Sequence, residues 1–218
     1  MQAAPQHHLT LDLPAPSSLA RQITTLVVHC AATPNGRVIG GRQPGQAGWR
    51  SPSSHIEEWH RVRGFRRAAA WVARHNPLLK HIGYHYVVDV DGRLWPGRHL
   101  AEAGAHAAGH NARSVGICLV GGLEDEGLYT PAQWQTLAQL VQRLAQHFGI
   151  PLQLPAQGRG GVCGHRDLGG DVGPDLTGNT KPARMLKTCP GFDVAAWLAA
   201  GLVPAERHVL GPAGEAAA

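Results

Sequence analysis

Two histidines and one cysteine, far apart in the chain, have side chains that bind metal ions. His29 closes the apolar run ITTLVVH, His165 lies in the short segment Gly-His-Arg-Asp, and Cys189 lies in Lys-Thr-Cys-Pro. Two imidazoles and one thiolate, with no fourth protein ligand evident, suit a catalytic zinc ion that keeps one position open for water. The spacing alone does not identify the site, because the chain contains neither HExxH nor a pair of CxxC motifs.

The segments that carry these residues predict one α/β domain with a central mixed β-sheet flanked by helices. The run 23–29 is rich in β-branched residues, as buried strands are, so His29 is expected at the carboxyl end of a central strand, where α/β sheets bind their ligands. Residues 114–122 predict a second buried strand, VCGH a short strand that ends at His165, and residues 82–98 a β-hairpin.

Helical periodicity predicts a first helix after the irregular loop 38–52. Ser53 or Ser54 is expected to cap it, because serine accepts a hydrogen bond from the first free backbone N–H groups. Ile56, Trp59 and Val62 recur at helical spacing and are expected to face the core. A second short helix is expected between Gly64 and Pro77.

The clearest helix of the sequence follows Thr130, which is expected to cap it, with Pro131 at the first helical position and Gly149 at the end. A further helix is expected over residues 192–202. The apolar face of the Thr130 helix is expected in the core and contains Trp134, Leu137, Leu140, Val141 and Leu144.

Length and composition favour a single globular core, since the 218 residues are 43% hydrophobic and 16% charged. We expect residues 1–20 to be a flexible arm, 21–202 the folded domain and 203–218 a flexible tail. No apolar run approaches the ~18–20 residues of a membrane span, and the first residues do not resemble a signal peptide. These features predict a cytoplasmic monomer with free thiols and no stable membrane association.

Positive charge is concentrated in the first half of the chain. Residues 1–100 hold 12 Lys and Arg against 5 Asp and Glu, a net charge of +7, and seven of the basic residues lie between Arg50 and Lys80. The segment lacks the interleaved aromatic residues that stack on bases, so no nucleic-acid partner is predicted. It is either an ordinary solvated surface or a surface that favours an acidic polymer such as the cell wall.

Several longer segments resemble a known family. Five segments are similar, in the same order, to the phage lysozyme-type N-acetylmuramoyl-L-alanine amidases: LVVHCAAT, GYHYVVDVDGRLWPGR, GAHAAGHNARSVGICLVGG, the helix that begins TPAQ, and KTCPGFD. These belong to the superfamily that includes the peptidoglycan recognition proteins. The resemblance covers about residues 23–200, with an additional basic segment at about 38–80.

The resemblance implies a function and a role for each matching residue. It implies a peptidoglycan hydrolase, typically an endolysin, that cleaves the amide bond between N-acetylmuramic acid and L-alanine after a separate membrane-permeabilising protein releases it to the wall. His29, His165 and Cys189 match the family's zinc ligands. Tyr84 and Lys187 match its two catalytic side chains, and His106 matches a histidine of the substrate groove.

Other functions remain open at this point. The related cytosolic enzymes that trim muropeptides have Asp in place of the cysteine ligand and a Glu in the strand that matches residues 114–122; this chain has Cys189 and no carboxylate in that strand. A muropeptide-recycling amidase is therefore a weaker alternative, as is a non-catalytic peptidoglycan-binding module, which typically lacks the cysteine. The phage branch also leaves open a role in binding the host transcription machinery.

Overall fold

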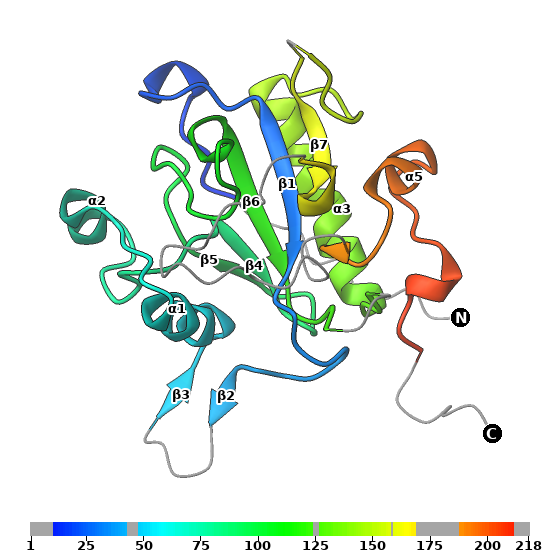
Figure 1. Cartoon of the computed structure of the whole chain (residues 1–218), viewed down its shortest axis with the longest axis horizontal. Helices are drawn as coiled ribbons and strands as arrows, with labels where there is room; N and C mark the ends of the chain where they lie inside the picture. The colour runs from blue at the N-terminus through cyan, green and yellow to red at the C-terminus, as the bar shows by residue number, and fades with distance from the viewer. Residues whose placement is uncertain (1–10, 43–47, 124–126, 158, 169–187, 212–218) are drawn as a thin grey trace.

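A five-stranded sheet organises the fold (Figure 1). The computed structural model describes residues 11–42, 48–123, 127–157, 159–168 and 188–211. The strands of the sheet, in the order β5-β4-β6-β1-β7, are β1 (Thr25–Cys30), β4 (Tyr86–Val88), β5 (Leu94–Pro96), β6 (Ser114–Leu119) and β7 (Gly161–Gly164). Only β5 is antiparallel to its neighbour within this sheet, which is therefore mixed, as the sequence predicts.

Helices and short turns surround the sheet. The α-helices are α1 (Pro52–Val62), α2 (Ala69–Arg74), α3 (Pro131–Phe148) and α5 (Val194–Ala199), and the 3₁₀ turns are η1 (Pro16–Ser18), η2 (Asn111–Arg113), η3 (His165–Asp167) and η4 (Glu206–His208). A separate antiparallel ribbon joins β2 (Gly41–Arg42) to β3 (Trp49–Arg50). The sequence predicted only an irregular loop there, because strands of two residues are too short to show a period.

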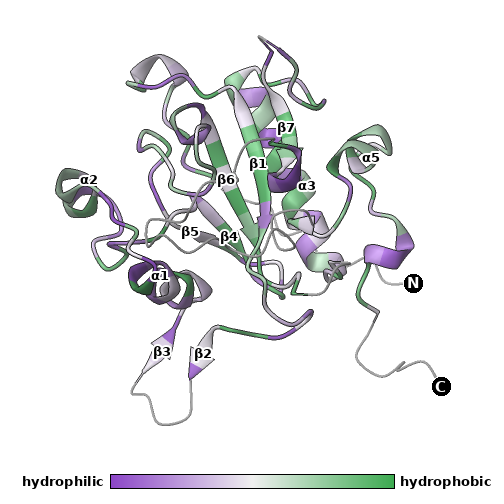
Figure 2. Cartoon of the chain, viewed as in Figure 1, coloured by the Kyte–Doolittle hydropathy of each residue, from purple (hydrophilic) through white to green (hydrophobic). Residues whose placement is uncertain are grey.

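The alternation of side chains along β1 separates the two faces of the sheet. Leu26 and Val28 belong to the main hydrophobic core, together with the buried face of α3, which lies behind the sheet in Figure 1. Because successive strand residues point to opposite faces, His29 points to the other face. That face is covered in part by a smaller cluster that includes Ile56 of α1 and Cys118 of β6. Figure 2 shows β1 as hydrophobic along most of its length.

Helix α3 forms as its sequence predicts. The Thr130 side chain accepts a hydrogen bond from Gln133 N–H, and the Gln133 side chain bonds back to the Thr130 backbone, so the first turn is capped from both sides. Gly149 ends the helix in the left-handed conformation, with φ of 65°. The five predicted apolar residues of its inner face are all buried, which fixes α3 against the sheet.

Helix α1 differs from the prediction in its cap and its buried face. Ser51, not Ser53 or Ser54, is the N-cap, and its hydroxyl accepts a hydrogen bond from Ser54 N–H at 3.2 Å. Ile56 is buried as predicted, but Trp59 is 39% exposed and Val62 68% exposed. The residue that completes the buried face is His60, one turn after Ile56. A polar residue on the inner face is invisible to a count of apolar periodicity.

The described parts of the expected arm and tail are packed against the domain. Leu11, Leu13 and Leu19 contact the main core, and His147 Nε2 donates a hydrogen bond to the carbonyl oxygen of Pro14 at 2.9 Å. At the other end, Leu210 N–H donates to the Tyr129 carbonyl at 2.8 Å. Residues 1–10 and 212–218 lie outside the described residues, so the predicted domain boundaries stay predictions. Within the described residues, no helix is both long enough and apolar enough to cross a membrane.

Candidate metal centre

The structure brings His29, His165 and Cys189 together. One ligand atom from each side chain lies within 4.8 Å of the others, and among the described residues no other set of three His, Cys, Asp or Glu side chains comes this close. Two nitrogen donors and one sulfur donor form the donor set of a zinc site with an open position. The residues present therefore fit the ion that the sequence predicts.

The sheet topology explains how residues 136 positions apart meet. Parallel pairing aligns β1 with β7, and His29 and His165 follow the carboxyl ends of the paired segments Thr25–Val28 and Gly161–Gly164. Arg166 N–H then donates to the Cys189 carbonyl at 2.9 Å, which ties the third ligand to the second. Gly164 makes this approach possible, because a Cβ there would lie 2.6 Å from the Pro190 ring.

Cys189 is buried, at 7% exposure, and is held from two sides. Its Sγ accepts a hydrogen bond from Cys30 N–H at 3.3 Å, and the next carbonyl, of Pro190, accepts one from the Tyr129 hydroxyl at 2.5 Å. A hydrogen bond between the thiols of Cys30 and Cys189, together with burial, raises the pKa of Cys189. Since a thiolate is the form that binds a metal, metal binding here would release a proton.

His29 lies at the centre of a cluster of aromatic side chains. It is 1% exposed, and its ring centroid lies 4.6 Å from that of His165, 4.9 Å from His106 and 5.1 Å from Tyr84. Burial, followed by the neighbouring histidines, lowers the pKa of His29 well below its usual range. The ring is therefore neutral at pH 7, which is the state in which imidazole ligates a metal.

Tyr84, predicted as catalytic, lies beside the three candidate metal ligands. Burial raises its pKa well above the usual value, and the thiols of Cys118 and Cys189 add to the effect. Its hydroxyl is hydrogen-bonded to Cys118, because β4, which begins two residues after Tyr84, pairs with β6. The phenol is consequently protonated at neutral pH and can act as a hydrogen-bond donor.

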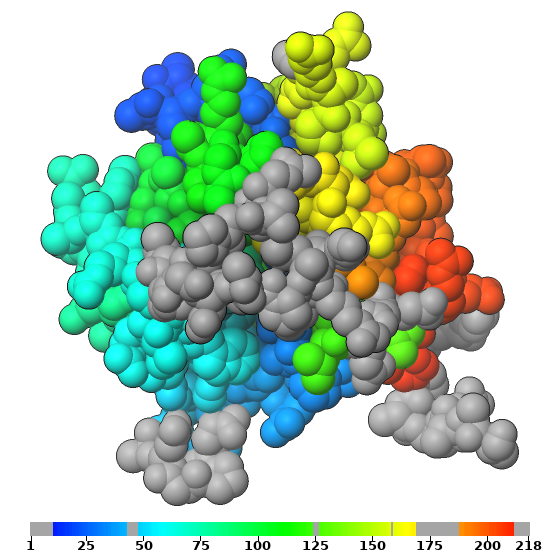
Figure 3. Space-filling model, in the orientation of Figure 1, coloured from blue at the N-terminus to red at the C-terminus, as the bar shows by residue number. Residues whose placement is uncertain are grey.

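His60 is a residue of this region that no motif in the sequence marks. It is 4% exposed, its Nδ1 accepts a hydrogen bond from Gly83 N–H at 2.9 Å, and its ring lies 5.3 Å from Tyr84. Through these contacts α1 positions the segment that carries Tyr84. In Figure 3, α1 (cyan) and the residues around β7 (yellow) lie on either side of the middle of the face shown.

Two further predictions concern Lys187 and the basic segment between Arg50 and Lys80. Lys187, the second predicted catalytic residue, lies outside the described residues. The basic segment between Arg50 and Lys80 does not form one exposed stripe, because the Arg67 side chain is fully buried and pairs with Glu102 at 2.8 Å. Arg61 pairs with Glu58 on the surface at 2.6 Å, while Arg66, Arg74 and Lys80 are exposed.

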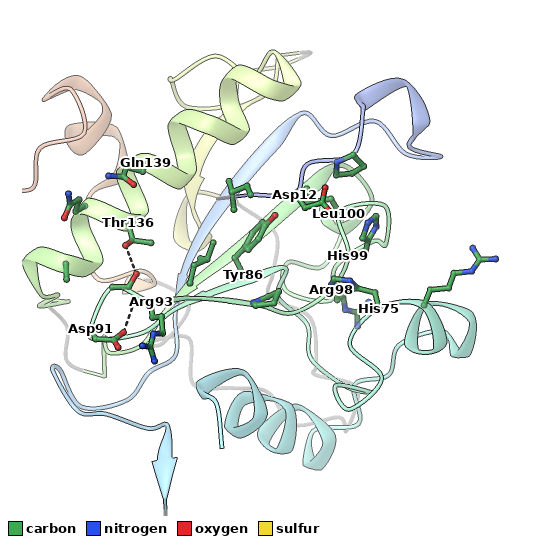
Figure 4. Close-up of a pocket in the computed structure, with 18 residues that line it drawn as sticks. Asp12, His75, Tyr86, Asp91, Arg93, Arg98, His99, Leu100, Thr136 and Gln139 are labelled. Atoms are coloured by element: carbon green, nitrogen blue, oxygen red, sulfur yellow. Dashed lines mark hydrogen bonds between the residues drawn. The ribbon is translucent and has the colours of Figure 1, made fainter. Parts of the chain in front are cut away.

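A cavity of about 1000 Å³ lies away from this chemistry (Figure 4). It opens between α3, β5 and residues 11–14, on the face of the sheet opposite to His29. Tyr86 lines its middle, and Asp91 and His99 lie toward opposite ends. None of the predicted site residues lines it, so its size does not bear on the metal centre.

Comparison with known proteins identifies the family of this chain. The family model for N-acetylmuramoyl-L-alanine amidases matches residues 19–192. This range contains the whole sheet and all three candidate ligands. The chain therefore belongs to the N-acetylmuramoyl-L-alanine amidase family.

Two relatives come from a phage and a bacterium. The endolysin of Enterobacteria phage T3 is 31% identical over 177 residues, covering 79% of this chain and 83% of the endolysin. An uncharacterized protein of Haemophilus influenzae is 47% identical over 114 residues, covering 50% of this chain and 88% of that protein. Among solved structures, the N-acetylmuramoyl-L-alanine amidase LysC from Clostridium intestinale URNW aligns with a TM-score of 0.48 and 24% identity, covering 77% of this chain and 84% of LysC.

Proposed function

We propose that this chain is a zinc-dependent amidase that hydrolyses the bond between N-acetylmuramic acid and L-alanine in peptidoglycan, as a phage or prophage endolysin. The proposal rests on one observation: the side chains of His29, His165 and Cys189 come together on one face of the sheet, in a member of the amidase family. The likeness to the endolysin of phage T3 over most of both chains supports the lytic role.

The three residues would hold zinc, and contacts within the chain position each of them. His29 is kept neutral by burial, Cys189 receives a backbone hydrogen bond on its sulfur, and His165 is fixed at the start of η3. When bound, zinc supplies a Lewis acid and lowers the pKa of a coordinated water to about 7.

The remaining chemistry requires donors for the negative charge that develops on the carbonyl oxygen. Tyr84 is a protonated phenol beside the ligands and is one such donor. Lys187, two residues before Cys189 in sequence, is proposed as the second. Attack of water forms a carbon–oxygen bond, the carbon–nitrogen bond breaks, and the departing amino group of L-alanine takes up a proton. A donor of this kind typically lowers the activation barrier by ~2.7–4 kcal/mol. Lys187→Ala is therefore expected to lower the rate roughly a hundred- to a thousandfold.

A comparison of two substrates tests this function. Purified sacculi and soluble anhydro-muropeptides would be incubated with the protein, and new L-alanine amino termini would be quantified in each. We expect faster release from sacculi. Faster cleavage of the soluble muropeptides would indicate a recycling enzyme instead, and binding to sacculi without any product would indicate a non-catalytic binding module.

A further inference from the structure

A short chain of polar side chains leads from His29 toward the amino-terminal end of β6. His29 Nε2 lies 3.0 Å from His106 Nδ1, and His106 Nε2 lies 3.4 Å from Ser114 Oγ. Ser114 Oγ in turn donates a hydrogen bond of 2.8 Å to the carbonyl oxygen of His110. We propose that His106 is a positioning residue that fixes the ring and the tautomer of His29, so that His29 presents Nδ1 to the metal. The inference rests on the zinc centre of the proposed function.

The hydrogen bond from Ser114 to the His110 carbonyl fixes the direction of the other two. A carbonyl oxygen only accepts, so the single hydroxyl proton of Ser114 is used on His110. The Ser114 oxygen can then only accept from His106, which places the proton of that ring on Nε2. Buried imidazoles stay neutral, so His106 Nδ1 is an acceptor and His29 Nε2 is the donor. The nitrogen of His29 that keeps its lone pair for a metal is therefore Nδ1.

The surroundings of His106 hold its ring in place for this role. A Cβ at Gly104 would lie 2.3 Å from the His106 ring, and one at Gly116 would lie 2.6 Å from it, so both positions must be glycine for the ring to fit. The backbone is fixed as well, because Asn111 Oδ1 accepts hydrogen bonds from His106 N–H at 2.8 Å and from Ala107 N–H at 3.0 Å. A ring enclosed in this way is suited to orient a neighbour.

An outer hydrogen bond of this type has a known effect on metal sites. A histidine ligand usually donates its second ring N–H to a neighbouring group, which fixes the ring and makes the ligating nitrogen more basic. Loss of such a partner typically lowers metal affinity or activity about 10- to 100-fold. Here the partner is another histidine rather than the usual carboxylate, carbonyl or water.

Zinc affinity in the full-length protein tests the role of His106. Competition with a chromogenic chelator would compare the wild type with His106→Ala, which removes the acceptor, and His106→Asn, which places an amide oxygen near the position of Nδ1. We expect about a 10- to 100-fold loss of affinity in the alanine variant and recovery of most of it with asparagine. His75→Ala, in a loop outside the metal-binding group, is the matched control and should bind zinc as the wild type does.

A second measurement does not depend on the variants. Nitrogen-15 NMR of the zinc-free wild type should show the His29 proton on Nε2. A proton on Nδ1 would overturn the inference, even if the alanine variant failed to fold. Unchanged zinc affinity in a folded His106→Ala protein, with KM raised, would also overturn it and would assign His106 to the substrate. A wild type that binds no zinc would contradict the proposed metal centre itself, which is a different result.

Discussion

Tyr84 and Tyr86 are two residues apart and contact different parts of the molecule. Tyr84 packs beside His29, whereas Tyr86 belongs to the main core and lines the cavity on the opposite face. The proposed role of Tyr84 as a hydrogen-bond donor to the reacting carbonyl predicts that removal of its hydroxyl slows the reaction without disturbing the candidate metal ligands. We expect Tyr84→Phe to lower kcat about 10²- to 10³-fold, with zinc affinity unchanged, in an assay of L-alanine termini released from sacculi.

Tyr86→Phe is the matched control for this change, because it removes the same hydroxyl from the other face of the sheet. It should keep wild-type kcat. Equal losses of kcat in the two variants would mean that the tyrosines act through stability rather than through chemistry.

His85 makes folding stability depend on pH. It is fully buried, its Nδ1 accepts from Gly116 N–H at 3.0 Å, and burial followed by the nearby Arg21 lowers its pKa well below the usual range. Below about pH 6.5 the unfolded chain binds a proton that the folded chain rejects. This contribution to stability is therefore present above about pH 6.5 and is lost as the pH falls.

Urea denaturation of the zinc-free protein at a series of pH values from 7.5 to 5 measures this effect. We expect the free energy of unfolding to fall less steeply in His85→Gln than in the wild type, by up to about 1.4 kcal/mol per pH unit. Parallel curves for the two proteins would contradict the assignment of a neutral buried His85.

At this scale the sequence predicted the three candidate metal ligands but not the residues around them. His29, His165 and Cys189 could be predicted because they lie in recognisable motif segments, and the structure confirms that their side chains come together. The contacts of Cys30 with Cys189 and of Tyr84 with Cys118 were not predictable, because they join remote segments whose cysteines resemble ordinary buried residues. The roles of Tyr84, Lys187 and His106 stay predictions.

At the scale of elements, the amino-terminal end of α1 offers a direct test of which serine caps the helix. Ser51 Oγ accepts from Ser54 N–H, whereas Ser53 is 2% exposed and its hydroxyl has no hydrogen-bond partner among the described residues. We expect Ser51→Ala to lower the free energy of unfolding by about 1 kcal/mol. Ser53→Ala should be neutral or stabilising, since it removes an unsatisfied buried hydroxyl. Urea denaturation of both variants would decide, and the reverse ranking would restore Ser53 as the cap.

Elements with strong local signals were predictable and weakly marked ones were not. Helix α3 has a capping box, a left-handed glycine and a continuous apolar face, so sequence and structure agree closely. Strands β2 and β3 pair with each other, but each is too short for its sequence to show an alternation of apolar and polar residues. In α1, His60 points inward because it contacts Gly83 and Tyr84. These residues lie outside the helix, so the sequence of the helix alone does not predict the position of His60.

For the whole molecule, the exposed basic residues after α1 predict an electrostatic contribution to the binding of cell-wall material. Arg66, Arg74 and Lys80 are exposed, whereas Arg67 is buried with Glu102 and is structural. We expect reversal of the three exposed charges to glutamate to weaken binding to sacculi at low salt, because solvent-exposed charges attract an acidic polymer over about 10 Å at 0.1 M ionic strength. The difference from the wild type should vanish as salt is raised.

A pelleting assay across a salt series measures this binding. Reversal of Arg159 and Arg207, two exposed residues in other parts of the chain, is the control and should have little effect. Equal binding by the wild type and the triple variant at every salt concentration would contradict a role for the basic segment.

The most direct test of the zinc amidase is removal and return of the metal. One preparation would be assayed on sacculi as purified, after dialysis against a chelator, and after addition of zinc, with the products identified by mass spectrometry. We predict that L-alanine amino termini appear, disappear and reappear, and that Cys189→Ser gives none in any state. Undiminished release after the metal is removed, or new reducing sugar ends in place of amino termini, would contradict zinc-dependent amide hydrolysis by this protein.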